Sequence, residues 1–226
     1  FALMPDSLSR WATNPVINLT IPALLLIGGI GFSVISDLWI HRGWRHLSLH
    51  SKLMLTGSAI LIVWSVTMFA ILEWHNPDTL GAFASPIDKL QISWFQGLTT
   101  RTAGFNTVDI GSMHDTTALM FILLMVIGAG STSTAGGIKV TTFIVLVLAT
   151  IAFFKRHNQL HAFGRSIGLE EVMKVLALTM ISMFVVMSGI FLITMSHDGD
   201  FLDLVFEVTS AFGTVGLSRG TTGELD

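Results

Sequence analysis

The sequence predicts an all-α integral membrane protein built from a repeated unit, with one helix broken at the middle of the membrane. Three observations predict it. Hydrophobic residues make up 51% of the 226 residues and charged residues only 12%, which is a membrane composition. The apolar residues come in blocks long enough to cross a bilayer. Two shorter apolar stretches each end in a similar Thr-x-Gly segment.

Four segments are long and apolar enough to span a bilayer core of about 30 Å: 16–36, 53–72, an interrupted 116–154, and 172–195. The joints 37–52 and 155–174 carry most of the Lys and Arg between these spans. Basic loops stay in the cytoplasm, so we expect the N-terminus, 73–115 and 196–226 outside. The scattered basic residues and the net charge of −3 argue against nucleic-acid binding.

Two stretches are helical but too short to cross. Ser85 followed by Pro86 is a helix-start signal for residues 87–99, and Asp200 opens a second stretch, 200–212. Each could dip into the membrane and return, or lie flat on its surface as an interfacial helix. The residues that follow favour the re-entrant interpretation.

Each short helix is followed by a Thr, a small or branched apolar residue, a Gly and a large apolar residue. These are Thr102-Ala103-Gly104-Phe105 and Thr214-Val215-Gly216-Leu217. Rings of backbone carbonyls from such loops replace the hydration shell of a potassium ion in potassium channels. We expect the carbonyls of Thr102, Ala103, Gly104, Thr214, Val215 and Gly216 to bind the ion, although a single such triplet is more often a turn. Phe1 has the position of a remnant of a further loop of this kind.

The interrupted span carries a run of small residues. As one helix, 116–154 would be about 58 Å long, whereas a hairpin would give a first arm of only about 11 residues. A single crossing broken by a gating loop fits best. The loop consists of Gly128, Ala129, Gly130, Ser131, Thr132, Ser133, Thr134, Ala135, Gly136 and Gly137, and Lys139 follows it. The alternative is a packing device, in which small residues let helices approach closely.

Two charged residues near these loops each allow two interpretations. Lys139 could tie down the loop or repel cations, or its side chain could extend to the cytoplasmic surface. Glu207 could brace the second filter-like stretch from behind, or lie solvated at its rim.

The motifs GLTTRTAGFNT at 97–107, SAFGTVGLS at 210–218, GAGSTSTAGGIKV at 128–140 and IGGIGFSVISDL at 27–38 carry a family likeness. The sequence resembles the Trk/Ktr/HKT superfamily of potassium transporters, most closely the membrane subunits of bacterial Ktr systems. The resemblance implies four fused repeats around one pore. Residues 1–50 would end the second repeat, 51–156 would form the third, and 157–226 the fourth without its inner helix. The filter departs from Thr-Val-Gly-Tyr-Gly at Ala103, Phe105 and Leu217, so fewer stacked carbonyl sites are expected.

The same resemblance implies a potassium-translocating subunit in the bacterial inner membrane, crossing it several times. It implies potassium as the transported ion, sodium as an activator of uptake, and no organic cofactor bound by this chain. The partners it implies are a second copy in a homodimer and a KtrA-like cytoplasmic nucleotide-binding ring. The alternative is a secondary transporter of a small organic solute, because broken helices also bind substrates. The spans hold no constellation typical of an enzyme.

Overall fold

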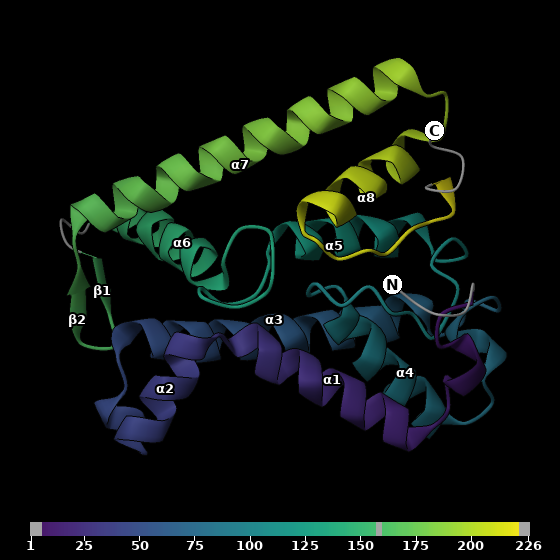
Figure 1. The fold of residues 1–226 in the computed structure, drawn as a ribbon, viewed down its shortest axis with the longest axis horizontal. Coiled ribbons are helices and arrows are strands. Elements are labelled where there is room, and N and C mark those ends of the chain that lie inside the picture. The colour runs from purple at the N-terminus through teal and green to yellow at the C-terminus, as the bar shows by residue number, and fades with distance from the viewer. Residues whose placement is uncertain (1–5, 157–159, 222–226) are drawn as a thin grey trace.

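The computed structural model describes residues 6–156 and 160–221, and in them helices dominate (Figure 1). Phe1 lies outside the described residues. The α-helices are α1 (Pro15–Ile30), α2 (Phe32–His41), α3 (Leu49–Glu73), α4 (Pro86–Thr99), α5 (Asp115–Val126), α6 (Val140–Phe154), α7 (Leu169–Ser196) and α8 (Phe201–Phe212). Short 3-10 helices occupy Ser9–Trp11, Trp44–His46 and Leu80–Ala82, and strands β1 (Leu160–Ala162) and β2 (Arg165–Ile167) form a hairpin.

Two helices of the described chain cross a membrane by length and composition, α3 with 25 residues and α7 with 28. They match the predicted spans 53–72 and 172–195. The predicted interruption of 116–154 is also present, as α5 and α6 separated by a non-helical loop. In the view of Figure 1, α7 runs along the top of the molecule and α3 through its middle, with the α5–α6 break between them.

The predicted span over 16–36 is apolar enough to cross, but it is not one straight helix. The helix breaks at Gly31, and α1 and α2 meet at a bend of 87°. Gly31 has a φ of 90°, and a Cβ there would lie 2.4 Å from the Ser131 carbonyl oxygen. A left-handed φ is costly for residues other than glycine. Position 31 at this bend therefore requires glycine, both for its φ and because the loop between α5 and α6 lies beside it.

The two short helices each pack against two other helices, and each buries one face. The α4 helix packs against α1 and α3, where Ser65 Oγ donates to the Gly97 carbonyl at 2.9 Å. The α8 helix packs against α5 and α7. Asp200 caps α8 by accepting from the Leu202 N–H at 2.9 Å, whereas Ser85 stands at the α4 cap without a side-chain capping bond. The re-entrant interpretation of both helices therefore agrees with the packing.

The basic joints lie together at one end of the molecule. Trp44, in the joint between α2 and α3, packs edge-on against Phe163 of the hairpin at a ring distance of 6.3 Å. The two-residue turn Phe163-Gly164 has φ values of 50° and 75°, which is the geometry of a tight hairpin turn. The hairpin was not predicted from the sequence. It places residues 160–167 beside the joint between α2 and α3, which agrees with a common cytoplasmic side for the two basic joints.

The opposite end is held by a buried carboxylate. Glu73, at the last position of α3, is fully buried. It accepts from Asn76 Nδ2 at 2.6 Å, Thr79 Oγ1 at 2.7 Å, the His114 N–H at 3.0 Å and Thr117 Oγ1. Because a buried charge is tolerated when hydrogen bonds satisfy it, Glu73 can join α3 to the start of α5.

The main hydrophobic core lies between α3, α5 and α8. Phe69, Phe121 and Phe206 have no exposed area, and the Val215 and Leu217 side chains belong to the same cluster. The second filter-like stretch is thus anchored in the core by alternate side chains. Its backbone is held firmly enough to keep an unusual conformation.

Candidate functional site

The two filter-like stretches have the same unusual backbone. Thr102 and Gly104 have φ values of 60° and 72°, and Thr214 and Gly216 have values of 51° and 87°. A positive φ is an outlier for a β-branched residue, and such strain costs about 1–3 kcal/mol where it occurs. The matched pattern, Thr and Gly left-handed with one residue between them, makes the two stretches equivalent units rather than unrelated turns.

The two stretches lie side by side. A Cβ at Gly104 would stand 2.2 Å from the Val215 carbonyl oxygen and 3.4 Å from the Gly216 carbonyl carbon. No side chain fits in that contact, so position 104 requires glycine for two independent reasons, its φ and its neighbour. The backbones of residues from two distant parts of the sequence therefore meet where the sequence predicted filter loops.

Each short helix fixes the carbonyl that follows its filter glycine. Thr99 Oγ1 donates to the Phe105 carbonyl, and Ser210 Oγ donates to the Leu217 carbonyl at 2.6 Å. The three carbonyls that precede each of these accept no hydrogen bond from the described residues 6–156 and 160–221. They are the carbonyls of Thr102, Ala103, Gly104, Thr214, Val215 and Gly216. Unclaimed carbonyls inside a membrane protein are tolerated where they line a watery cavity. Thr99 and Ser210 were not predicted as part of the site.

Arg101 is the charged residue nearest the first filter-like stretch. Its side chain is 8% exposed, and it faces a small cavity shared with Gly29 and Ile30 of α1 and with Ala129. Its Nη2 has no hydrogen-bond partner in the described chain. Arg101 follows the C-terminal end of α4 and shares its cavity with the last residues of α1. Because helix C-termini carry partial negative charge, the two helix ends stabilise the buried guanidinium.

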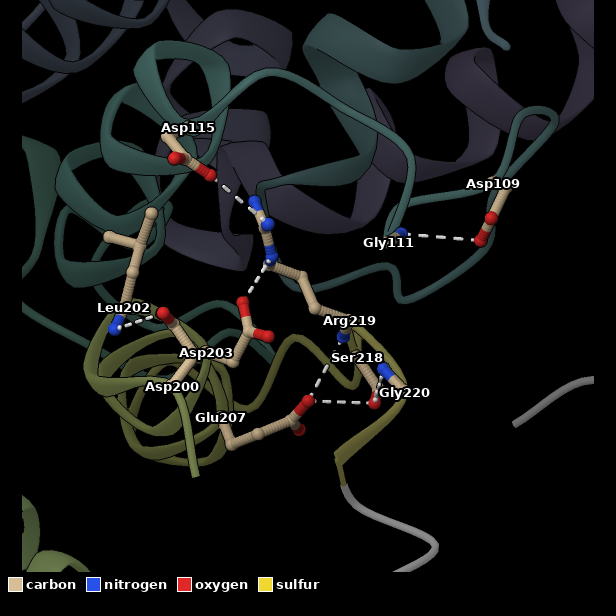
Figure 2. Close-up of polar contacts among 10 residues, drawn as sticks. All are labelled: Asp109, Gly111, Asp115, Asp200, Leu202, Asp203, Glu207, Ser218, Arg219 and Gly220. Carbon is tan, nitrogen blue, oxygen red and sulfur yellow. Dashed lines mark hydrogen bonds and ion pairs between the residues drawn. The ribbon is translucent and has the colours of Figure 1, made fainter. Parts of the chain in front are cut away.

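Glu207 braces the segment after the second filter-like stretch, as one of its two interpretations predicted. Its carboxylate accepts from Ser218 Oγ at 2.7 Å and from the Arg219 N–H at 2.9 Å, and its side chain is buried rather than solvated at a rim. Figure 2 shows the Arg219 guanidinium between Asp203 of α8, at 2.5 Å, and Asp115 of α5, at 3.3 Å. Glu207 and Arg219 together hold residues 218–219 against the starts of α8 and α5.

The loop between α5 and α6 closes on itself. The Gly128 N–H donates to the Ile138 carbonyl at 2.8 Å, and the Ile138 N–H donates to the Val126 carbonyl at 2.9 Å. The bridge between Ile127 and Ile138 is parallel, so the chain runs in the same direction before and after the loop. This geometry agrees with one crossing broken in its middle and excludes a hairpin that turns back.

Four further contacts fix the 128–137 loop. On one side the Gly130 N–H donates to the Gly29 carbonyl at 2.8 Å, and Thr132 Oγ1 lies 2.9 Å from Ser33 Oγ, at the α1–α2 bend. On the other side the Gly136 N–H donates to Thr214 Oγ1 at 2.9 Å. The Lys139 ammonium donates to the Ala135 carbonyl. The loop therefore connects the bend at Gly31 to the first residue of the second filter-like stretch.

The close contacts in this loop also support the packing interpretation, which stays open beside gating. A Cβ at Gly128 would lie 1.8 Å from the Gly136 carbonyl oxygen, and one at Gly130 would lie 2.5 Å from the Ile30 oxygen. Small residues are thus required here for backbone approach. The Lys139 ammonium donates to a carbonyl of this loop, which agrees with holding the loop in place; its part in gating stays a prediction.

These features define an all-α integral membrane protein with re-entrant helices, backbone carbonyl loops and a broken crossing. The chain belongs to the TrkH family of cation transport proteins, which matches residues 1–226. The Ktr system potassium uptake protein B of Bacillus subtilis is 47% identical over 225 residues, and that of Vibrio alginolyticus is 39% identical over 227. The potassium/sodium uptake protein NtpJ of Enterococcus hirae is 35% identical over 231 residues.

The matches to these three relatives cover 100% of this chain but only 50% of each relative. The chain therefore spans about half of their length. Among solved structures, the potassium transporter TrkH from Vibrio parahaemolyticus has the same fold, with a TM-score of 0.75 and 20% identity over 96% of this chain and 48% of that one. The relatives are cation transport proteins rather than enzymes. The family places the chain in the bacterial inner membrane, as a multi-pass protein.

Proposed function

We propose that this chain is part of the potassium-translocating subunit of a bacterial potassium uptake system. The observation that carries the proposal is the pair of adjacent loops with matched left-handed residues and six unclaimed carbonyls. A potassium ion sheds its water only where several carbonyls replace it. The C-terminal ends of α4 and α8 precede these loops and add partial negative charge. A homologous pair of loops from the rest of the protein would complete a ring of four.

The 128–137 loop would act as the gate. Its hydrogen bond to Thr214 is placed at the first residue of the second filter-like stretch. A single neutral hydrogen bond contributes only about 1 kcal/mol, so this contact can open without unfolding the helices around it. The bend at Gly31 and the Lys139 ammonium would hold the closed position from the other side.

The larger assembly is proposed from the relatives. They are named as parts of Ktr systems, which fits a regulatory partner such as a KtrA-like ring, and one is named for potassium and sodium uptake. We infer a homodimer, activation by sodium, and repeats at 1–50, 51–156 and 157–226, each of which rests on the family likeness.

The test is rescue of a potassium-uptake-deficient bacterium by the full-length gene, followed by competition of labelled uptake by sodium, rubidium and caesium. We expect growth at low external potassium and competition by rubidium well before sodium. Two results would show that the loops serve another transport reaction. One is uptake that no alkali cation inhibits, and the other is growth that the gene rescues only when an organic solute is supplied.

A further inference from the structure

A cavity of about 430 Å³ opens between α3 and α6, outside the filter and the gate. Its walls are almost wholly apolar, with Leu53, Ile60 and Leu61 on α3 and Ile144, Val147 and Leu148 on α6. Ile60 is 63% exposed and Val147 is 39% exposed, so the cavity is open toward the surroundings of the helices.

The cavity has a closed end. Ala162 and Phe163 of the β-hairpin complete its lining, and Phe163 rests against Trp44 from the joint between α2 and α3. Tryptophan collects at the level of lipid headgroups because its ring is apolar at one edge and donates a hydrogen bond at another. The closed end therefore lies at the cytoplasmic surface, and the open wall lies deeper in that leaflet.

A basic side chain stands at this closed end. In the hairpin register, Arg165 is the direct partner of Ala162, and paired residues of an antiparallel ladder project from the same face. Arg165 is exposed and belongs to no ion pair within the described residues. The nearby acidic residues Glu170 and Glu171 are engaged by Lys174 at 2.8 and 3.6 Å. The charge of Arg165 is thus available to an anion at the headgroup level.

From this arrangement we propose that the groove binds one anionic phospholipid of the cytoplasmic leaflet. One acyl chain fills the space between α3 and α6, and the phosphate pairs with Arg165. The apolar lining excludes an ordered water cluster, which needs polar partners. A cavity of this volume fits a hydrocarbon chain but not a helix with its side chains, which is about 10 Å in diameter. The proposal rests on the membrane location of the chain and does not depend on which ion is transported.

The experiment counts lipids bound to the purified full-length protein by native mass spectrometry. The protein is stripped with detergent and then supplied with dioleoyl phosphatidylglycerol or dioleoyl phosphatidylcholine. The wild type should keep one phosphatidylglycerol per chain at detergent concentrations that remove phosphatidylcholine. Val147→Trp fills the groove and should abolish that retention, and Arg165→Gln should remove the preference for phosphatidylglycerol. Two variants serve as matched controls. Ile71→Trp adds the same bulk on α3, at the end of the helix far from the groove, and Lys174→Gln removes a charge that is already paired.

A diazirine-labelled phosphatidylglycerol provides a second measurement on the wild type, which needs no substitution to fold. Its acyl chain should crosslink to peptides that contain residues 53–61 or 143–148. Equal retention of the two lipids by the wild type, unchanged retention in Val147→Trp, or crosslinks spread evenly over all helices would each overturn the proposal. The last result would mean ordinary boundary lipid, and absence of any crosslink would mean that another part of the protein covers the groove.

Discussion

At the scale of single residues, the two filter glycines give the sharpest test. Gly104→Ser and Gly216→Ser each put a side chain on a left-handed residue, and at 104 it also meets the Val215 carbonyl. A strain of about 1–3 kcal/mol that opposes ion binding corresponds to a loss of potassium affinity of roughly fivefold to a hundredfold. We expect potassium uptake and its preference over sodium to fall in both variants.

The control for these substitutions is Gly28→Ala, because an added Cβ there has no neighbour within 4 Å and the residue lies in a regular helix. It should transport like the wild type. Unchanged affinity and unchanged ion preference in both filter variants would remove these loops from the ion pathway.

Glu73 gives a prediction about stability. Glu73→Gln replaces an acceptor of four hydrogen bonds by an amide that must turn a donor toward at least one of the same donors. Hydrogen bonds to a buried charge contribute about 1.5–3 kcal/mol, so we expect a loss of unfolding free energy of about 3 kcal/mol. Thermal denaturation of the purified full-length protein measures it. Glu171→Gln, an exposed position on α7, should change little, and equal melting temperatures for all three proteins would contradict the role of Glu73.

Individual residues also show what the sequence can and cannot reveal, although ion binding at the two filter-like stretches stays a prediction. Thr102 to Phe105 and Thr214 to Leu217 could be located because a Thr-x-Gly triplet after a short apolar helix is a local pattern. Thr99, Ser210 and Arg101 could not, because their roles depend on a carbonyl or a cavity that only the folded chain brings near. A hydroxyl in the last turn of a short helix has no distinguishing local signal.

At the scale of elements, shortening the 128–137 loop distinguishes a gating role from a packing role. If the loop blocks the pathway, its shortening removes a barrier without altering the filter carbonyls. Maximum potassium uptake should then rise, with affinity and sodium discrimination near the wild-type values. Lys139→Ala should act in the same direction but less strongly, because it releases only the contact to Ala135. Uptake kinetics and membrane protein levels are measured together.

A pure packing role predicts the opposite result for the same shortened protein. Loss of the backbone contacts at Gly128 and Gly130 would then lower the amount of protein in the membrane. Normal protein levels with unchanged or lower maximum uptake would contradict gating.

Elements also show why the break inside the predicted span 16–36 was missed. Residues 16–36 read as a continuous apolar run, and glycine occurs often enough in membrane helices that Gly31 gives no clear break signal. Its left-handed φ follows from Ser131, a residue 100 positions later in the chain. The hairpin at 160–167 was missed for a related reason, since its charged sequence resembles an ordinary cytoplasmic joint. By contrast, α4 and α8 each begin with a local signal, Pro86 or Asp200, and both were predicted.

At the scale of the whole molecule, the orientation in the membrane can be tested directly because the chain contains no cysteine. In a cysteine-free full-length protein, Arg165→Cys should react with a membrane-impermeant maleimide only after the cells are opened. Asp109→Cys, in the exposed loop between α4 and α5, should react in intact cells. Basic loops determine this arrangement. Labelling of both positions from the same side would overturn the assignment of cytoplasmic and outer ends.

The parallel bridge between Ile127 and Ile138 has a consequence for how the length of the loop between them can change during evolution. The strand of polypeptide leaves the α5 axis and rejoins it beside its point of departure, still heading the same way. Residues can therefore be inserted into or deleted from this detour while the helices on either side keep their direction across the bilayer. If the loop gates the pathway, natural variation in its length would adjust how easily the pathway opens without reversing the sidedness of any downstream segment. Evolution could thus tune transport rate separately from topology.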